Sequence, residues 1–393
     1  MNNSKLNVWL LDPAQLTPYY NVTLADALVQ TGCNVRYIAS PYLYDTNLSY
    51  SDRFKIDYLY FKGLHNPKLI RYPNLRRILR GISYPLGHLQ LIRQLRQNRP
   101  DILHIQWSRV PHVDYRLVKA ARDLGIAVIH TVHDVIPSYA PNASTGPLER
   151  VFSLANALIL HTQTNRTEFH KQYPTINLER THVIPLINAH YMATPDNVTQ
   201  TLAREQLNLP LSVPIFLFFG AIRPYKGVDL LIAAFNEARK TMPELHLMIA
   251  GKPDTPEDQA ILEIGRRSPN IHVTSGFVPY EAMWQYYIAA DIVVLPYRSI
   301  TQSAALLSAM DFGKPVIVTN VGGLAETLDG NGWVIPPNDI DLLTNVIRDA
   351  ANNRVQLEKM GHRSLQLIEQ NHAPAVVAER TRKLYEQTLA AHQ

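Results

Sequence analysis

Short apolar runs that alternate with helical segments limit this chain to a small set of folds. Residues 6–11 and 34–39 are expected to be strands on either side of a helix that begins near Thr17, with Pro18 in its first turn. The alternation continues to about residue 185. Strands that alternate with helices in this way indicate a parallel, doubly wound sheet.

The same alternation starts again at residues 215–219 and continues toward the C-terminus, and 393 residues suffice for two domains of ordinary size. We therefore expect an α/β protein with two Rossmann-like, doubly wound parallel-sheet domains, residues 1–190 and 191–375, that face a central cleft. A last helix within residues 376–393 is expected to cross back onto the first domain. Residues 40–85 are expected to be an irregular excursion, because they are too long for a simple connection.

The composition is that of a globular protein, with 46% hydrophobic residues. Its longest apolar runs, residues 215–219 and 292–295, are far shorter than the roughly 18–20 residues of a membrane-spanning helix. An N-terminal apolar run stops at Asp12, which argues against a signal peptide. Cys33 is the only cysteine, so no disulfide can form within the chain. These features predict a cytoplasmic location, which includes the inner face of the membrane.

The net charge of +5 is unevenly distributed. Residues 67–100 contain no acidic residue, and Leu, Ile and Tyr are interleaved among eight basic ones: Lys68, Arg71, Arg76, Arg77, Arg80, Arg93, Arg96 and Arg99. Basic amphipathic segments favour anionic membrane surfaces, which makes peripheral membrane contact one interpretation. A solvated helix face is the other. Nucleic acid is not expected as a partner, because no recognition motif accompanies the charge.

Residues 292–326 are expected to form a strand, a loop, a helix, a second strand and a glycine turn. Ser303 is a candidate N-cap, and Gly313 with Pro315 ends the helix. Such a unit presents free backbone N–H groups at a helix start, beside the carboxyl ends of parallel strands. Open α/β sheets bind phosphorylated ligands at this position.

Four segments carry a resemblance to a known family: FFGAIRPYKGVDLLIAAF (218–235), MIAGKP (248–253), GFVPYEAMWQYYIAADIVVLPY (276–297) and FGKPVIVTNVGGLAE (312–326). In order and spacing they resemble the C-terminal half of GT-B glycosyltransferases, most of all family 4, whose members are retaining enzymes that use nucleotide sugars. DILHIQW (101–107) and VIHTVHDVIP (128–137) resemble the N-terminal half.

The resemblance implies a GT-B hexosyltransferase that moves a sugar from a UDP- or GDP-sugar to a glycan acceptor. The basic segment at residues 67–100 favours an acceptor oligosaccharide linked to lipid, as in exopolysaccharide or O-antigen assembly. The nucleotide sugar is a substrate. Neither a cofactor nor a metal is expected, because this fold does not usually need one.

The resemblance also implies which residues hold the diphosphate of the donor. The family's pattern of a Gly followed by a Lys-Gly pair corresponds here to Gly220 and, after five intervening residues, Lys226-Gly227, with Ala221 in place of the usual Arg. Arg223 is the expected substitute. Cations here would stabilise the charge that develops on the leaving diphosphate.

The family's Glu-x7-Glu pattern is replaced. Its two positions, which in the family contact the donor sugar and the ribose, fall on Ile300 and Ser308. A serine can still bond a ribose hydroxyl, more weakly than a carboxylate. The helix start is expected to meet the diphosphate, with further candidates for donor contact around it: Arg298, Gln302, Ser303, Ala304, Phe277, Val278 and, facing the donor sugar, Glu326.

In the first domain, His133 follows an expected strand and matches a histidine that the family places near the acceptor and the anomeric carbon. We interpret His133 as catalytic together with Arg223, Lys226 and Glu326. Asp134 and Trp107 are candidates for acceptor binding, since they too follow strands.

Two alternatives remain open at the level of the sequence. The missing glutamates favour an inverting transferase of the β-mannosyl or β-glucuronosyl type, in which Asp134, Glu326 or His133 would deprotonate the acceptor. They are also consistent with a degenerate transferase that serves as a partner subunit.

Overall fold

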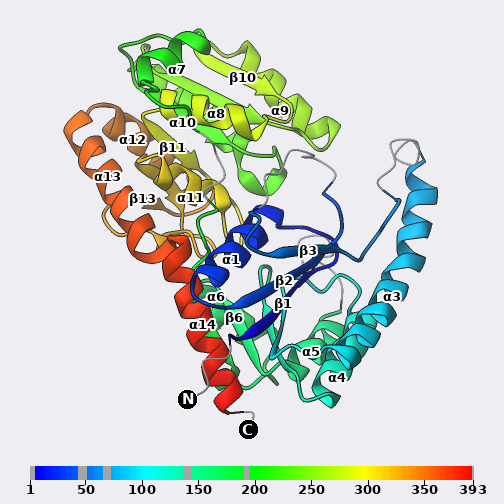
Figure 1. Cartoon of the computed structure of the whole chain (residues 1–393). Helices are drawn as coiled ribbons and strands as arrows, with labels where there is room; N and C mark the ends of the chain where they lie inside the picture. The colour runs from blue at the N-terminus through cyan, green and yellow to red at the C-terminus, as the bar shows by residue number, and fades with distance from the viewer. Residues whose placement is uncertain (1–4, 43–50, 65–71, 136–143, 190–193, 392–393) are drawn as a thin grey trace. The chain divides into compact units, whose positions relative to one another are not determined.

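The chain divides into two compact units in the computed structural model, which describes residues 5–42, 51–64, 72–135, 144–189 and 194–391 (Figure 1). Unit 1 comprises residues 1–189 and 372–393, and unit 2 comprises residues 190–371. The C-terminal helix α14 (Pro374–Ala390) therefore belongs to unit 1.

Unit 1 contains a seven-stranded parallel sheet in the order β3-β2-β1-β4-β5-β6-β7. Its strands are β1 (Asn7–Asp12), β2 (Asn34–Ala39), β3 (Lys55–Tyr58), β4 (Ile102–Ile105), β5 (Ala127–Thr131), β6 (Ala157–Leu160) and β7 (Thr181–Val183). Its other helices are α1 (Pro18–Gln30), α3 (Pro73–Gln97), α4 (Pro111–Asp123), α5 (Gly146–Leu154) and α6 (Gln163–Gln172).

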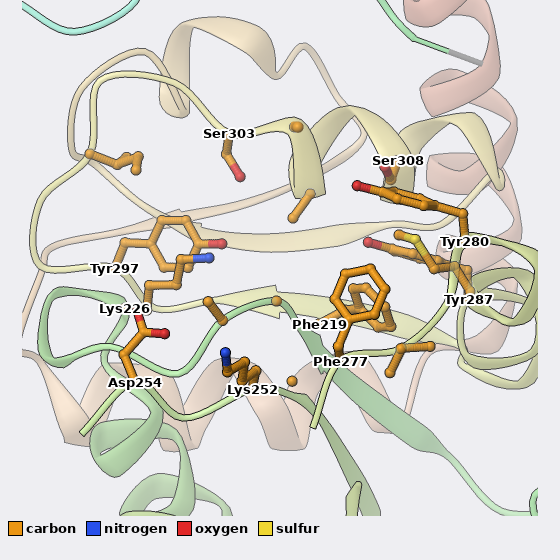
Figure 2. Close-up of a pocket in the computed structure, with 18 of the residues that line it drawn as sticks. Phe219, Lys226, Lys252, Asp254, Phe277, Tyr280, Tyr287, Tyr297, Ser303 and Ser308 are labelled. Carbon is orange, nitrogen blue, oxygen red and sulfur yellow. The ribbon is translucent and has the colours of Figure 1, made fainter. Parts of the chain in front are cut away.

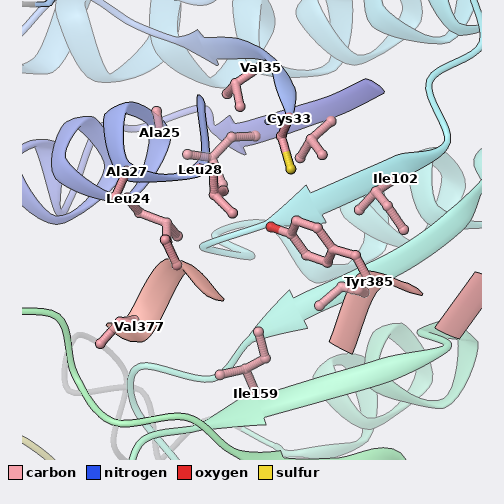
Figure 3. Packing of buried hydrophobic residues seen from close by; sticks show 14 of the residues in the cluster. Leu24, Ala25, Ala27, Leu28, Cys33, Val35, Ile102, Ile159, Val377 and Tyr385 are labelled. Atoms are coloured by element: carbon pink, nitrogen blue, oxygen red, sulfur yellow. The ribbon is translucent and has the colours of Figure 1, made fainter. Parts of the chain in front are cut away.

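Both faces of this sheet are buried, which explains the continuous apolar runs of its strands. In β1, Val8 and Leu10 join a core with α1 and α14, whereas Trp9 and Leu11 join a second core with α3 and α4. Figure 3 shows the first core, in which Tyr385 of α14 lies among side chains of the sheet and α1.

Unit 2 contains a six-stranded parallel sheet in the order β10-β9-β8-β11-β12-β13. Its strands are β8 (Ile215–Phe219), β9 (His246–Gly251), β10 (Ile271–Ser275), β11 (Ile292–Leu295), β12 (Val316–Thr319) and β13 (Gly332–Ile335). Its helices are α7 (Gln200–Gln206), α8 (Val228–Arg239), α9 (Pro256–Arg267), α10 (Tyr280–Ala289), α11 (Ala304–Asp311), α12 (Ile340–Ala351) and α13 (Arg354–Leu367). The strand order changes direction between β8 and β11, where ligands bind in such sheets.

The expected fold class, α/β with two Rossmann-like parallel-sheet domains, is confirmed. The expectation that residues 40–85 are irregular is wrong for part of that range, because β3 pairs with β2 and α3 starts at Pro73. β3 lies at the edge of the sheet and none of its residues is fully buried, so it lacks the apolar signal of the inner strands. Residues 43–50 and 65–71, including Lys68 and Arg71 of the basic segment, lie outside the described residues.

No helix in the described part of the chain has both the length and the apolar character needed to cross a bilayer.

Candidate functional site

A cavity of about 480 Å³ lies in unit 2 at the carboxyl ends of β8, β9, β10 and β11 (Figure 2). This is the edge where the strand order changes direction, the usual ligand position of a doubly wound sheet. Its lining includes the following residues that the sequence singled out: Gly220, Lys226, Phe277, Val278, Ile300, Gln302, Ser303, Ala304 and Ser308. The cavity thus gathers most of the residues expected to hold a donor.

Lys226 supplies a cation to this cavity. Its side chain is partly buried, with Nζ 5.4 Å from the ring centroid of Tyr297. A Cβ at Gly220, whose φ is +137°, would lie 2.9 Å from Nζ of Lys226. The ammonium can occupy this position because residue 220 is a glycine and has no Cβ. Burial first, and then the charge of Arg223, lowers the pKa of Lys226 to about 8. No described residue hydrogen-bonds this ammonium, and a desolvated cation is stabilised by an anionic ligand.

A second cation, Lys252, also lines the cavity, and sequence reasoning gave it no role. It directly follows β9, a position that the quoted segment MIAGKP already marked. Arg223 does not line the cavity, and its Nε donates to Asp254 Oδ2 at 2.6 Å. Asp254 is the only carboxylate among the described lining residues, so the cavity is positive.

The N-terminus of α11 points hydrogen-bond donors toward the cavity. Ser303 is confirmed as the N-cap, with Oγ accepting from the N–H of Leu306 at 3.3 Å. Ser303 and Ala304 both line the cavity. Gln302 Nε2 is buried and has no hydrogen-bond partner among the described residues. A helix start with such donors favours an anion such as a phosphate.

Ile300 and Ser308, the two positions that the sequence was expected to match to the family's glutamates, both line the cavity. Ser308 is buried, and Ile300 lies in the loop before α11. Gly322 fixes this loop, since its φ is +51° and a Cβ there would lie 1.8 Å from the carbonyl oxygen of Ile300. The Gly322 turn therefore holds the loop that carries Ile300.

Aromatic side chains form the other end of the cavity. Figure 2 shows Phe277, Tyr280, Tyr287 and Ser308 on the side opposite Tyr297 and Lys226. Phe277 is 56% exposed, which excludes core packing, and its ring lies 6.0 Å from that of Tyr280. Sequence reasoning missed both tyrosines, because nothing in the run YEAMWQYY separates lining from core residues.

Arg298 lies outside the cavity lining and holds the loop that carries Lys226. Its guanidinium pairs with both carboxylate oxygens of Asp229, at 2.9 and 2.6 Å, and donates to the carbonyl of Pro224 at 2.6 Å. Burial alone would raise the pKa of Asp229, but the hydrogen bonds and charge of Arg298 hold it below its ordinary value. Arg298 is thus placed to position Lys226.

Glu326 lies in a short helical turn, Ala325–Thr327, and is exposed. It is not among the residues that line the cavity.

In unit 1, Trp107, His133 and Asp134 line a small hollow where β4 and β5 end. The rings of Trp107 and His133 stack, with centroids 4.9 Å apart and planes 16° from parallel. Trp107 Nε1 donates to Thr17 Oγ1 at 3.0 Å. The three acceptor-side residues singled out in the sequence are therefore neighbours.

Both ring nitrogens of His133 have partners within unit 1. Nε2 lies 2.9 Å from Gln106 Oε1, and Nδ1 lies 3.3 Å from Nε2 of His161. His161 Nδ1 in turn lies 3.0 Å from the carbonyl oxygen of Ile184. Burial, and then the neighbouring histidines, lowers the pKa of His133 well below its usual range. His133 is therefore neutral at pH 7 and held in a fixed orientation.

Among the described residues, no group of three or more His, Cys, Asp or Glu side chains is arranged to hold a metal ion. Asp339 and Asp341 form an Asp-x-Asp pattern, in which two carboxylates are separated by one residue. The carboxylate of Asp339 is engaged in the fold, because it caps α12 by accepting from the N–H of Leu342.

Two family models match the chain, one in each unit. The model described as "Glycosyltransferase Family 4" matches residues 19–186, and the one described as "Glycosyl transferases group 1" matches residues 199–366. Between them they span most of the chain.

Relatives among characterised proteins are distant. GDP-mannose:glycolipid 4-beta-D-mannosyltransferase of Xanthomonas campestris pv. campestris is 26% identical over 263 residues, 62% of this chain and 68% of that protein. GDP-mannose-dependent alpha-(1-6)-phosphatidylinositol monomannoside mannosyltransferase of Mycolicibacterium smegmatis is 28% identical over 242 residues, 58% of this chain and 61% of that protein.

A solved structure, sucrose-phosphate synthase from Thermosynechococcus elongatus, has a similar fold. It superimposes with a TM-score of 0.71 at 19% identity and covers 98% of this chain and 100% of that one.

Proposed function

Since this chain belongs to the GT-B glycosyltransferases of the family 4 type, we propose that it transfers a hexose from a UDP- or GDP-sugar to a glycan acceptor. The observation that carries the donor assignment is the Lys226 ammonium, partly buried at the wall of the unit 2 cavity without a hydrogen-bonding partner among the described residues. The diphosphate of a nucleotide sugar is the anion that satisfies it.

The two ends of the cavity suggest how the donor lies. The diphosphate takes the end with Lys226, Lys252 and the start of α11. The base and ribose take the aromatic end, where Phe277 offers an exposed ring and Ser308 a hydroxyl. Charge that develops on the departing diphosphate is then stabilised by two lysines and by helix N–H groups. In this proposal the lysines of the chain stabilise the diphosphate, and no metal ion is required.

The acceptor is proposed to be a glycan linked to lipid, in an assembly of the exopolysaccharide or O-antigen type at the cytoplasmic face of a membrane. Two relatives support this, because their names specify a glycolipid and a phosphatidylinositol mannoside as acceptors. In unit 1, the half-buried ring of Trp107, which stacks on His133 beside Asp134, offers an aromatic surface that suits one face of a sugar ring.

We propose that the transfer retains the anomeric configuration, as in the family that the sequence resembles. The second candidate is an inverting transfer, which the replaced glutamates favour together with a relative named as a β-mannosyltransferase. An inverting reaction needs a side-chain base. The candidates for this base are Asp134, Glu326 and His133, of which Asp134 and His133 line the hollow of unit 1.

A screen of nucleotide sugars tests the function. The purified protein is incubated with UDP- and GDP-hexoses, and release of UDP or GDP is followed with and without a lipid-linked glycan. We expect turnover with one nucleotide, and loss of it in Lys226→Met. Release from none of the donors would contradict the proposal. Proton NMR of the product's anomeric signal then separates retention from inversion.

A further inference from the structure

Helix α3 (Pro73–Gln97) has two apolar faces, and only one of them is covered by unit 1. The inner face places Tyr84, Leu91 and Leu95 in a core of unit 1. The opposite face carries apolar side chains that are 47–62% exposed and follow one another at intervals of three or four residues. This outer stripe consists of Tyr72, Leu75, Ile78, Ile82, Leu86 and Leu89.

The inner face of α3 is fixed, so the helix cannot turn to bury its outer stripe. Asp114 Oδ1 accepts from Tyr84 OH at 2.7 Å and lies 3.0 Å from His88 Nε2, with all three side chains buried. A Cβ at Gly87 would lie 2.6 Å from the ring of Tyr60, so α3 approaches this ring as closely as a glycine permits. The exposure of the outer stripe is therefore a property of the fold.

The charge around the outer stripe is of one sign. Arg93 and Arg96 continue its spacing beyond Leu89, and both are exposed. No acidic residue occurs between Pro67 and Pro100. An apolar stripe with arginines beside it fits a surface that offers anionic groups above an apolar layer.

We propose that α3 docks unit 1 onto an anionic lipid bilayer. The outer stripe enters the boundary between headgroups and acyl chains, and the arginines bind lipid phosphates. A second copy of this chain fits less well, because two such helices would bring arginines together with no acidic partner on either helix. The proposal goes beyond the transfer reaction and holds whichever donor the unit 2 cavity binds.

Co-sedimentation of the full chain with lipid vesicles tests this. We expect binding to vesicles that contain phosphatidylglycerol, weakened by salt, and little binding to phosphatidylcholine alone. The double variant Ile82→Ser, Leu86→Ser is expected to lower the partition coefficient at least about tenfold. Each of Arg93→Gln and Arg96→Gln is expected to lower it on the order of fivefold. Ile264→Ser on α9 and Val355→Ser on α13 remove equally exposed apolar side chains in unit 2 and are the matched controls.

A fluorescent label tests where the chain touches the vesicle. Cys33 is the only cysteine and is buried, so Ile82→Cys can be labelled selectively with an environment-sensitive fluorophore. A blue shift on phosphatidylglycerol vesicles is expected for Ile82→Cys and not for Ile264→Cys. The proposal is overturned if wild type binds neither vesicle, binds both equally, or responds equally at both labelled positions. It is also overturned if the protein instead forms a dimer in solution that Ile82→Ser dissociates. Circular dichroism and UDP or GDP binding confirm that each variant is folded.

Discussion

Lys226 is the residue on which the donor assignment depends most. Its ammonium lies at the wall of a cavity where helix N–H groups and a second lysine, Lys252, add further positive charge. Burial lowers the pKa of Lys226 to about 8, so the charge needed for a diphosphate is present at neutral pH and is lost above it. This leads to a prediction about pH.

The affinity for UDP or GDP is predicted to fall as pH rises above about 8, approaching tenfold per pH unit once Lys226 is mostly neutral. In Lys226→Arg the fall should disappear, because a guanidinium keeps its charge in this range. In the unliganded chain the sign for stability is opposite. The unfolded chain holds the lysine proton up to its ordinary pKa of 10.5, whereas the folded chain releases it near pH 8. The free energy of unfolding is therefore expected to increase as pH rises from 8 to 10.5. Isothermal titration calorimetry between pH 7 and 9.5 checks the binding, and identical profiles for wild type and Lys226→Arg would contradict the assignment.

Ser308 lines the cavity at a position that the sequence was expected to match to a carboxylate of the family, which gives a prediction of gained function. If the ribose lies at the aromatic end of the cavity, Ser308→Glu supplies a charge-assisted bond to its hydroxyls and raises affinity for the nucleotide about tenfold. The 2′,3′-dideoxynucleotide is the control, since it should gain nothing. Equal or weaker binding of the ordinary nucleotide would place the ribose elsewhere.

At the scale of elements, the site is built from loops that other loops hold in place. The stretch from β11 to β12 supplies Gln302 and Ser303, and the Gly322 turn packs against the carbonyl of Ile300 to fix it. Arg298 joins the same stretch to the turn that carries Lys226 through Pro224 and Asp229. Arg298, which lies outside the cavity lining, therefore helps to determine where Lys226 lies.

Arg298→Ala is predicted to weaken nucleotide binding although Arg298 is not a lining residue. Without the contacts of Arg298 to Asp229 and Pro224, the turn before α8 is no longer held in place. We therefore expect about a tenfold loss of affinity for the nucleotide, which corresponds to the free energy of one or two hydrogen bonds to a charged group. Asp229→Asn should show a smaller loss of the same kind, because the amide keeps one acceptor. Arg239→Ala, in the last turn of α8, is the matched control. Calorimetric titration with UDP or GDP measures these affinities. Unchanged affinity in Arg298→Ala would contradict the role of Arg298 in positioning Lys226.

The sequence predicted those elements whose apolar pattern is strong. Buried inner strands such as β8 and β11 were found within a residue of their bounds, and Ser303 was identified as a cap because capping chemistry is local. The edge strand β3 was missed because its side chains are only partly covered. The role of Arg298 could not be predicted, because its partner Asp229 is distant in sequence and only the folded sheet brings the two together.

At the scale of the whole molecule, the last helix completes the first unit. α14 packs on α1, and Tyr385 is fully buried with its hydroxyl 2.6 Å from His104 Nδ1. His104 in turn lies 3.1 Å from Gln106, the partner of His133. Helix α14 thus supports side chains that hold the lining of the hollow in unit 1.

Tyr385→Ala is predicted to destabilise unit 1 by about 3–5 kcal/mol, the usual cost of removing a buried aromatic side chain. Tyr385→Phe, which loses only the hydroxyl, should cost about 1 kcal/mol. Hydrogen exchange followed by mass spectrometry checks both, with faster exchange expected in α1, β1 and β4. Protection of β8, β9 and β11 in unit 2 is the internal control, and equal loss in both units would contradict the assignment of α14 to unit 1.

Calorimetric titration of wild type and Lys226→Met with UDP and GDP tests the central claim most directly, with Lys240→Met as the control because Lys240 is an exposed lysine on a neighbouring element. We predict that wild type and Lys240→Met bind one of the two nucleotides with equal affinity, and that Lys226→Met binds it at least about tenfold more weakly. Binding of that nucleotide by Lys226→Met as tightly as by wild type, or no binding by any of the three proteins, would contradict the assignment of the unit 2 cavity to a nucleotide-sugar donor.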